Sequence, residues 1–427
     1  MSAPFDYFQY KSGKLTAEGV SLEKIADLTG TPVYIYSAEA FLSPLRELKK
    51  GLAKLDHLVC FAVKSNSNIA ILKMLADEGA GMDLVSGGEL YRAGAAGIAG
   101  GKIVFSGVGK TPGEMDQALH YQDQGILSFN VESVGELKML SAVATQSGKV
   151  APVALRFNPD VNAKTHPYIS TGLKKNKFGM TRQEILAAAK NLKEFPNIKF
   201  QGISVHIGSQ LLSLSPLAEA FAFAKELKHE LDEILLEPLS IMDLGGGVGI
   251  TYKNEKAPPL QKYCELVNQA FGPKAKFKNP VKILIEPGRR MAGNSGILLT
   301  EVLYRKTRQA KDFLIVDAAM NDLIRPALYE SYHDIVPVEK KRGKPRNTDI
   351  VGPVCETGDC FASDRKLPGD LNQGDLVAIM SAGAYGFTMA SNYNSRPKPP
   401  EVLVRNGKFR VIRKRETYDD LIGLETV

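Results

Sequence analysis

Residues 58–85 read LVCFAVKSNSNIAILKMLADEGAGMDLV, which is a short apolar run, a longer helical pattern and a second apolar run. The first run is Leu58–Val63, the helical pattern is Ile69–Gly79, and the second run is Met82–Val85. Short apolar runs that alternate with longer amphipathic stretches are typical of βα units in a parallel sheet. We therefore predict one strand–helix–strand repeat here.

The same alternation continues as far as Ile285. The apolar runs are Leu58–Val63, Met82–Val85, Lys102–Phe105, Ile126–Phe129, Val153–Phe157, Ile203–Ile207, Ser240–Asp243 and Lys282–Ile285. The helical patterns between them include Ile69–Gly79, Gly88–Gly97, Val134–Gln146, Gln183–Lys193, Pro216–Leu236 and Leu260–Phe271. Eight parallel strands over roughly 230 residues match a (β/α)₈ barrel of the α/β class. A doubly wound open sheet shows the same alternation, but the count of eight favours the barrel.

After Glu286 the alternation stops, and we predict a β-rich C-terminal domain. The segments that read as strands, without regular helices between them, are Ile297–Tyr304, Phe313–Val316, Leu376–Met380 and Glu401–Val411. We therefore divide the chain into three parts. Residues 1–36 form an N-terminal segment that packs with the β-domain, residues 37–285 form the barrel, and residues 286–427 form the C-terminal β domain.

The composition is that of a globular chain with a buried core. Of 427 residues, 44% are hydrophobic and 24% are charged, so extended disorder is not expected. The net charge is +7, but the basic residues are scattered, and only residues 340–346 and 410–415 are dense. We interpret both segments as solvated surface rather than as a nucleic-acid site. An excess of positive charge suits a protein that handles phosphate and carboxylate groups.

The four cysteines do not form a metal-binding pattern. They are Cys60, Cys264, Cys355 and Cys360, with no Cys-x-x-Cys pair and no histidine cluster, so we expect no metal site. The first residues lack the basic-then-apolar pattern of a signal peptide, and no stretch is apolar enough to span a membrane. We therefore expect a cytoplasmic protein with no membrane partner.

Polar residues follow several predicted barrel strands, at the end of the barrel where active sites lie. Lys64 follows the first strand, where partial burial favours the neutral amine that forms a Schiff base. Taken alone, such a lysine is more often a surface residue. His206 and Ser209 follow the sixth strand, where a histidine can stack on a flat ring and a serine can bind a phosphate. A core histidine with satisfied hydrogen bonds is the commoner explanation of a single His.

Two further motifs follow the seventh and eighth strands. Residues 243–249 read DLGGGVG, and backbone N–H groups without side chains can approach a phosphate closely. This is not a dinucleotide fingerprint, because Ile250 stands where the third glycine is required. The second motif is Glu286–Arg289, which reads EPGR. Its glutamate can keep a pyridine nitrogen protonated, and Arg289 can bind a carboxylate with two parallel bonds. The alternative for the glycine motif is a plain tight turn, and the alternative for Glu286 and Arg289 is an ordinary ion pair.

Each feature is weak alone, but together they form the parts of a pyridoxal 5'-phosphate (PLP) site. The same residues resemble the group III PLP-dependent decarboxylases, and within them the diaminopimelate decarboxylases, over nearly the whole chain. The matching segments are Phe61–Asn66, Asp83–Leu90, His166–Gly172, Lys177–Gly179, His206–Gln210, Asp243–Gly249, Glu286–Arg289, Asp317–Tyr329, Gly352–Asp359 and Ser381–Gly386. The resemblance implies an alanine-racemase-like barrel that binds PLP, followed by a β domain. It also implies decarboxylation of meso-2,6-diaminopimelate to L-lysine and CO₂, the last step of lysine biosynthesis.

The resemblance also implies how the cofactor is bound. Lys64 would carry PLP, His206 would stack on its ring, and Glu286 would pair with the pyridine nitrogen. Ser209, Gly246, Gly247 and Tyr385 would bind the phosphate. The full set implied for the cofactor is Lys64, Asp83, His206, Ser209, Gly246, Gly247, Glu286, Gly288, Arg289 and Tyr385.

For the reaction, the resemblance implies a homodimer with shared active sites. Cys355 would donate a proton from the partner subunit, so the implied catalytic residues are Lys64, His206 and Cys355. The set implied for the substrate is Arg289, Arg325, Tyr329, Glu356 and Tyr385. The two arginines would bind the distal carboxylate of meso-diaminopimelate, and Glu356 its distal ammonium. Ornithine has no distal carboxylate and would leave a buried arginine pair without its anion.

Four other functions stay open at this point. An ornithine, arginine or carboxynorspermidine decarboxylase usually carries Asp after the cysteine, where this chain has Glu356. A racemase of the same fold gives the Cys355–Glu356 pair no role. A non-catalytic PLP-binding regulator is not expected to keep both Lys64 and Cys355, and a nicotinamide oxidoreductase lacks its fingerprint. The departures from the family pattern are Arg290, Ala319 and Ser65.

Overall fold

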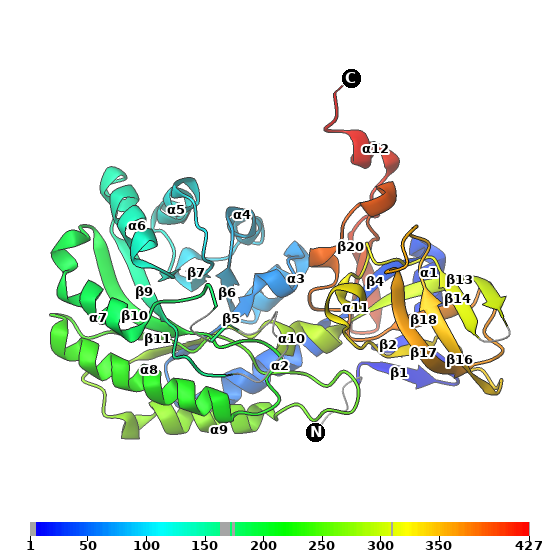
Figure 1. Ribbon diagram of the computed structural model, residues 1–427, viewed down its shortest axis with the longest axis horizontal. Coiled ribbons are helices and arrows are strands. Elements are labelled where there is room, and N and C mark those ends of the chain that lie inside the picture. Colours follow the sequence, from blue (N-terminus) through cyan, green and yellow to red (C-terminus); the bar gives the residue numbers. More distant parts are fainter. Residues whose placement is uncertain (1–5, 163–170, 173–175, 309–310, 427) are drawn as a thin grey trace. The chain divides into compact units, whose positions relative to one another are not determined.

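The computed structural model describes residues 6–162, 171–172, 176–308 and 311–426. The chain divides into two compact units, which are coloured along the sequence in Figure 1. The β-rich unit consists of Met1–Phe41, Thr251–Glu255 and Met291–Val427, and the barrel unit consists of Leu42–Ile250 and Lys256–Arg290. The matching segment His166–Gly172 lies largely outside the described residues.

The barrel unit is a closed ring of eight parallel strands. The strands are β5 (His57–Ala62), β6 (Gly81–Leu84), β7 (Ile103–Phe105), β8 (Ser128–Val131), β9 (Ala151–Phe157), β10 (Ile198–Val205), β11 (Ile241–Asp243) and β12 (Lys282–Ile285). The last strand pairs with the first, Leu284 beside Leu58, so the predicted barrel is confirmed and the open sheet is excluded. All carboxyl ends of the strands therefore lie at one mouth of the barrel.

Helices alternate with these strands and lie around them in Figure 1. They are α2 (Ala38–Gly51), α3 (Ile69–Asp77), α4 (Gly87–Ala95), α5 (Pro112–Leu119), α6 (Val134–Gln146), α7 (Arg182–Lys190), α8 (Ser215–Ile234) and α9 (Leu260–Phe271). The short helix α10 (Arg289–Ala292) follows the last barrel strand, β12. Local sequence fixes where several begin. Thr111 and Thr181 each accept from the backbone N–H three residues on, and Glu114 and Glu184 bond back to the capping residue. Each such cap stabilises its helix by about 1 kcal/mol.

The β-rich unit is built on a sheet whose main path runs β17-β16-β14-β13-β4-β19-β20. Strand β18 also pairs with β13, and β15 pairs with β18. Its strands are β4 (Val33–Ser37), β13 (Gly296–Thr307), β14 (Asp312–Val316), β15 (Ile335–Pro337), β16 (Pro345–Val351), β17 (Cys360–Pro368), β18 (Leu376–Ile379), β19 (Glu401–Arg405) and β20 (Lys408–Arg413). The helices of this unit are α1 (Leu22–Thr29), α11 (Arg325–Tyr329) and α12 (Tyr418–Ile422), and a small sheet adds β1 (Phe8–Lys11), β2 (Lys14–Ala17) and β3 (Val20–Ser21). The N-terminal strand β4 lies between β13 and β19, so both ends of the chain are needed to complete this sheet.

One predicted segment of this unit is wrong in detail. Glu401–Val411 is not one strand but the antiparallel pair β19 and β20. Asn406 and Gly407 between them have φ values of 52° and 72°, which is the Asn-Gly hairpin turn that the sequence already carries. The core of the unit is an apolar cluster that includes Val33, Ile35 and Ile297, all fully buried.

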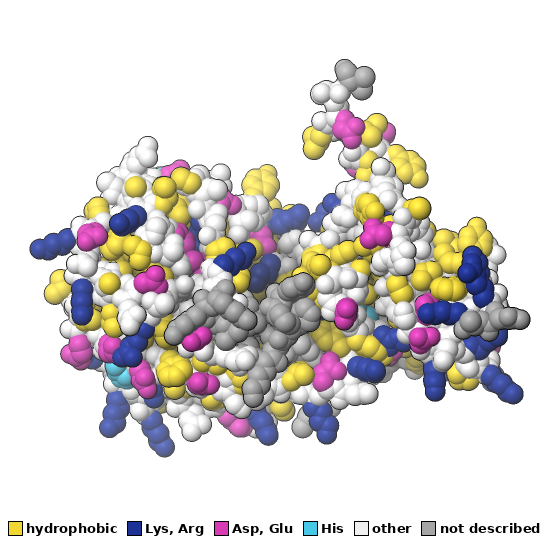
Figure 2. Space-filling view, viewed as in Figure 1, with side chains coloured by type: hydrophobic (Ala, Val, Ile, Leu, Met, Phe, Trp, Pro, Cys, Tyr) yellow, Lys and Arg dark blue, Asp and Glu magenta, His cyan; other side chains and the backbone are white. Residues whose placement is uncertain are grey.

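The face of the molecule shown in Figure 2 carries side chains of mixed character. On the face seen in Figure 2, Lys and Arg side chains lie among acidic and apolar ones on both units rather than in a single basic patch. Within the part of the chain that the structure describes, no helix has the length and apolar character needed to cross a membrane. The same residues contain no group of three or more His, Cys, Asp or Glu side chains placed to hold a metal ion.

Candidate active site

Four predicted site residues lie at or beside the carboxyl ends of the barrel strands. Lys64 is in the short turn Val63–Ser65 that follows β5, and Asp83 is on β6. His206 directly follows β10, and Glu286 directly follows β12. Because these strands belong to one closed parallel ring, the four side chains come from the same mouth of the barrel.

Lys64 and Asp83 form an ion pair. The Lys64 Nζ lies 3.1 Å from Asp83 Oδ2. The lysine side chain is 39% exposed, whereas the aspartate is fully buried. The other carboxylate oxygen of Asp83, Oδ1, is buried without a hydrogen-bond partner. The amine is therefore reachable from solvent and is held by a carboxylate that retains unused acceptor capacity.

Glu286 shares the barrel with a second buried carboxylate, Asp243. Asn130 Nδ2 donates to Asp243 Oδ2 at 2.8 Å and to Glu286 Oε1 at 3.2 Å, so one amide bridges the two acids. Burial raises the pKa of Glu286 well above its usual value, and the nearby charges of Asp243 and Asp83 raise it further. Burial likewise raises the pKa of Asp243. These acids would be stabilised in their charged form by a cation placed beside them.

His206 is bound to the glycine loop that follows β11. The backbone N–H of Gly246 donates to His206 Nδ1 at 3.2 Å, so in the neutral ring the proton is on Nε2. Burial, together with the charges of Arg156 and Lys64, lowers the pKa of His206 well below its usual value. The ring is therefore neutral at pH 7, which suits stacking on an aromatic ligand.

The glycine loop needs its glycines for close packing. Gly245 has a φ of 63°, and a Cβ there would lie 2.5 Å from the carbonyl oxygen of Val205. At Gly246 a Cβ would lie 2.3 Å from the carbonyl oxygen of Glu286. The backbone N–H of Gly245 donates to Asp243 Oδ1 at 3.0 Å. The loop is thus fixed on the carboxyl ends of β10 and β12, with Asp243 tying it to the acid pair.

Arg289 and Ser209 contact each other. Arg289 is 7% exposed, and its Nε donates to Ser209 Oγ at 3.1 Å. Gly288 precedes it, and a Cβ there would lie 3.1 Å from Ala62 Cβ. The departure Arg290 donates to the carbonyl oxygen of Gly249 at 3.4 Å, so it contacts the end of the glycine loop. Burial lowers the pKa of Arg290.

In the β-rich unit, helix α11 carries Arg325 and Tyr329. Arg325 is 4% exposed, and Tyr329 is half-buried. The guanidinium donates to two neutral hydroxyls, and its Nε has no hydrogen-bond partner. Among the described residues no carboxylate lies within 4.0 Å of it. A buried arginine without an acid is an unusual and costly arrangement, which an anionic ligand would relieve.

Cys355 and Glu356 lie in the connection between β16 and β17, and both are exposed. The Cys355 backbone N–H donates to Asn394 Oδ1 at 3.1 Å, and Tyr393 Oη donates to Glu356 Oε2 at 2.9 Å. The connection is braced from inside by Asp359, which is 3% exposed and accepts from the backbone N–H of Val354 at 2.7 Å. The thiol and carboxylate are thus presented outward on a fixed base.

Tyr385, the last predicted residue, lies in the loop after β18. It is half-buried and has a φ of 56°, in the left-handed region that residues other than glycine rarely adopt. Such backbone strain of the order of 1 kcal/mol is concentrated at functional sites.

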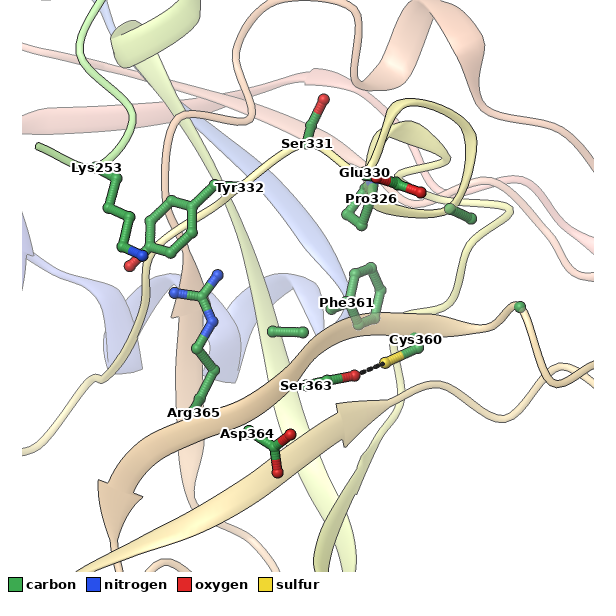
Figure 3. Close-up of a pocket in the computed structure, with 13 residues that line it drawn as sticks. Lys253, Pro326, Glu330, Ser331, Tyr332, Cys360, Phe361, Ser363, Asp364 and Arg365 are labelled. Atoms are coloured by element: carbon green, nitrogen blue, oxygen red, sulfur yellow. Dashed lines mark hydrogen bonds between the residues drawn. The ribbon is translucent and has the colours of Figure 1, made fainter. Parts of the chain in front are cut away.

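A cavity of about 530 Å³ also lies in the β-rich unit, beside α11. It is lined in part by Lys253, Ser331, Tyr332 and Arg365 (Figure 3), and none of the predicted site residues lines it. The Arg365 guanidinium lies 3.6 Å from the centre of the Tyr332 ring. The cavity therefore lies next to helix α11, which carries Arg325, but it is separate from the predicted site residues.

Sequence reasoning missed the residues that connect the predicted ones. In the barrel these are Asn130 and Ser106, together with Asp243, which lies in the predicted glycine motif but was given no role of its own. In the β-rich unit they are Tyr252 and Ser331, which bind Arg325. A signal existed for the first group, because Ser106 directly follows β7 and Asn130 lies one residue before the end of β8, near the same strand ends as Lys64 and Glu286. No such signal marks Tyr252 or Ser331.

The barrel residues fit PLP. Two buried acids, Asp243 and Glu286, have no cation within 4.0 Å among the described residues, and Asp83 retains an unpartnered oxygen. A protonated pyridine nitrogen supplies the missing cation, and an amine at the same mouth, Lys64, can form a Schiff base with the aldehyde. Fold and site thus define a PLP-binding barrel enzyme.

The comparisons identify the family. Residues 40–293 match the family model described as pyridoxal-dependent decarboxylase, pyridoxal binding domain. A diaminopimelate decarboxylase from Aquifex aeolicus is 46% identical over 417 residues, which are 97% of this chain and 96% of that protein. One from Pseudomonas aeruginosa is 46% identical over 424 residues, 99% of each chain. The chain belongs to the diaminopimelate decarboxylase family of PLP-dependent carboxy-lyases.

Solved structures agree with this. Diaminopimelate decarboxylase from Helicobacter pylori, complexed with L-lysine, has a TM-score of 0.88 and 42% identity, and the alignment covers 94% of this chain and 98% of that one. The enzyme from M. jannaschii, also in complex with L-lysine, has a TM-score of 0.91 and 37% identity, with 100% and 99% covered.

Proposed function

We propose that this chain uses PLP to decarboxylate meso-2,6-diaminopimelate, giving L-lysine and CO₂ in the last step of lysine biosynthesis. The observation that carries this choice of substrate is Arg325, a buried guanidinium without an acid among the described residues. Meso-diaminopimelate brings a second carboxylate, which ornithine lacks. The names of the relatives at 46% identity support the same reaction.

PLP, when bound, withdraws the electron pair that the departing CO₂ leaves behind. Lys64 would hold the cofactor covalently, with Asp83 beside its amine. Glu286 would bind the pyridine nitrogen and keep it protonated, and the neutral ring of His206 would stack on the cofactor. Ser209, Gly246, Gly247 and Tyr385 would bind the phosphate, with Gly288 and Arg289 lining the same site.

Cys355 of the partner subunit would supply the proton. The bond from the α-carbon to its carboxylate breaks at the D-configured centre, CO₂ leaves, and a proton from the thiol takes its place. Arg289, Arg325 and Tyr329 would bind the distal carboxylate, with Tyr385 nearby, and Glu356 would bind the distal ammonium. The exposed position of Cys355 and Glu356 supports a role at a surface that a second copy covers.

We further propose that the protein works as a homodimer in the cytoplasm, without nucleic-acid or membrane partners. The mixture of acidic and basic side chains on the face shown in Figure 2 supports the absence of a nucleic-acid partner. The three-part division at residues 1–36, 37–285 and 286–427 likewise stays a proposal.

The test is a product assay on the purified protein with PLP. Meso-diaminopimelate and ornithine are supplied separately, and lysine and putrescine are measured. We expect lysine from the first and little putrescine from the second. Putrescine as the main product would leave the PLP site standing and overturn the role of Arg325. An absence of product from either substrate would favour a racemase or a PLP-binding regulator.

A further inference from the structure

Two neutral side chains hold the buried Arg325 in the β-rich unit. Arg325 Nη1 donates to Tyr252 Oη at 2.9 Å, and Arg325 Nη2 donates to Ser331 Oγ at 3.1 Å. A guanidinium has five N–H donors in a rigid plane, so two bonds on different nitrogens fix its orientation. Because both acceptors are uncharged, they orient the cation without neutralising it.

Tyr252 is itself held from three sides. It lies in the connection that follows β11, in the part assigned to the β-rich unit, and is 9% exposed. The Arg325 guanidinium lies over its ring at 5.2 Å from the centroid, and the His333 ring packs edge-on at 5.7 Å. Its backbone N–H donates to Glu255 Oε1 at 2.7 Å. The phenol therefore offers both a cation–π contact and a hydrogen bond from one fixed position.

Ser331 is placed by the end of helix α11. Glu330 has a φ of 51° and turns the chain, so that the Ser331 backbone N–H returns to the carbonyl oxygen of Arg325 at 3.4 Å. In Figure 3 Ser331 lies at the edge of the cavity, and its hydroxyl points away from Phe361 and Cys360. The hydroxyl is thus directed to Arg325 by backbone geometry.

The Nε–H of Arg325 stays buried and unpartnered in this arrangement. Two parallel bonds to a carboxylate need the guanidinium plane to be fixed, because rotation breaks both bonds together. We propose that Tyr252 and Ser331 are positioning residues, which aim Arg325 at the distal carboxylate of the substrate and so set the preference for amino acids with a second carboxylate. This inference rests on the proposed function, since it takes the distal carboxylate as the ligand of Arg325.

The experiment compares two ligands of the PLP-loaded enzyme. L-lysine keeps the distal carboxylate, whereas cadaverine is the same chain without it. We would measure the dissociation constant of each for the wild type, Tyr252→Phe and Ser331→Ala. Loss of one bond that orients Arg325 should weaken ligand binding about fivefold to tenfold, the effect of one typical net hydrogen bond. We expect that loss for L-lysine, and a change of less than about twofold for cadaverine, in both variants.

Turnover of meso-diaminopimelate is measured on the same preparations. The KM is expected to rise in parallel with the lysine constant, and kcat to stay within about threefold, because the reacting carbon is not touched. Tyr263→Phe is the matched control. It removes a hydroxyl from a buried tyrosine of helix α9 and is expected to leave both constants unchanged. A variant that folds poorly would lower the amount of active enzyme and would leave the ratio of the two constants unchanged.

The outcomes separate the two proposals. The positioning role would be overturned if the variants lost affinity for L-lysine and cadaverine equally, or if neither variant lost affinity for L-lysine. Lysine formation by the wild type would still support the proposed function in both cases. A wild type that forms no lysine would overturn the proposed function, and a wild type that binds both ligands equally would overturn the role of Arg325 itself.

Discussion

The acid pair at the barrel mouth and the Cys355–Glu356 pair of the β-rich unit are presented in opposite ways. Glu286 and Asp243 are buried in the barrel and are joined by Asn130, so hydrogen bonds between strand ends determine their positions. Cys355 and Glu356 are exposed, and one backbone contact and one tyrosine hydrogen bond hold them. A buried acid pair suits the proposed cofactor site, and an exposed thiol suits the proposed proton donor to another copy of the chain.

Replacement of Lys64 by Ala has the largest expected effect. Without the amine beside Asp83, PLP loses its covalent attachment, and kcat for lysine formation should fall by roughly 10³-fold or more. The visible absorption of protein-bound PLP should also change. The control is Lys73→Ala, which removes an exposed lysine of α3. A Lys64→Ala variant with the absorption of the wild type would contradict the assignment.

Replacement of Cys355 by Ala should lower kcat by roughly 10²-fold, as expected for loss of a positioned proton donor. Because the thiol is exposed, the melting temperature should not change. Cys360→Ala on β17 serves as the matched cysteine control. Full lysine formation by Cys355→Ala would show that another group donates the proton.

Replacement of Glu286 by Gln tests the buried acid cluster through pH. Burial and Asp243 raise the pKa of Glu286 in the folded protein, so the folded apoenzyme holds this proton more tightly than the unfolded chain does. The stability of the apoenzyme therefore falls as pH rises from the unfolded pKa toward the folded one. Glu286→Gln should reduce this fall at pH values above the usual pKa of a glutamate side chain and raise the melting temperature there.

The same variant should bind PLP about tenfold more weakly, because the neutral amide no longer balances a protonated pyridine nitrogen. Thermal scans of apoenzyme and PLP-loaded enzyme measure both effects, with the exposed Glu226→Gln as control. A variant with the pH profile and PLP affinity of the wild type would show that Glu286 is not the acid that faces the ring.

Replacement of Tyr393 by Phe has the smallest expected effect. Its hydroxyl donates to Glu356 at 2.9 Å at an exposed position, so its loss should raise the KM by about threefold and leave kcat unchanged. Steady-state kinetics check this, with exposed Tyr418→Phe as control. An unchanged KM would mean that Glu356 needs no support from Tyr393.

The sequence predicts the barrel and several of its site residues, but not the contacts that join them. The barrel follows from the strand–helix rhythm, and the rule that active sites lie at the carboxyl ends of strands locates Lys64, His206 and Glu286. The bridge from Asn130 to Asp243 could not be predicted, because it joins strands that are far apart in the sequence and depends on side-chain orientation. Tyr252 and Ser331 have no periodic signal at all, since both lie in irregular segments placed by tertiary packing.

The most direct test of the division between the two regions is subunit mixing. Lys64→Ala and Cys355→Ala proteins, each nearly inactive, are mixed in equal amounts under conditions that allow subunit exchange, and lysine formation is measured. If Cys355 serves the barrel of the partner subunit, half of the dimers are mixed and each contains one intact site, so activity should return to about a quarter of the wild-type value. A mixture that stays as inactive as its components would show that each copy uses its own Cys355 or that no site is shared.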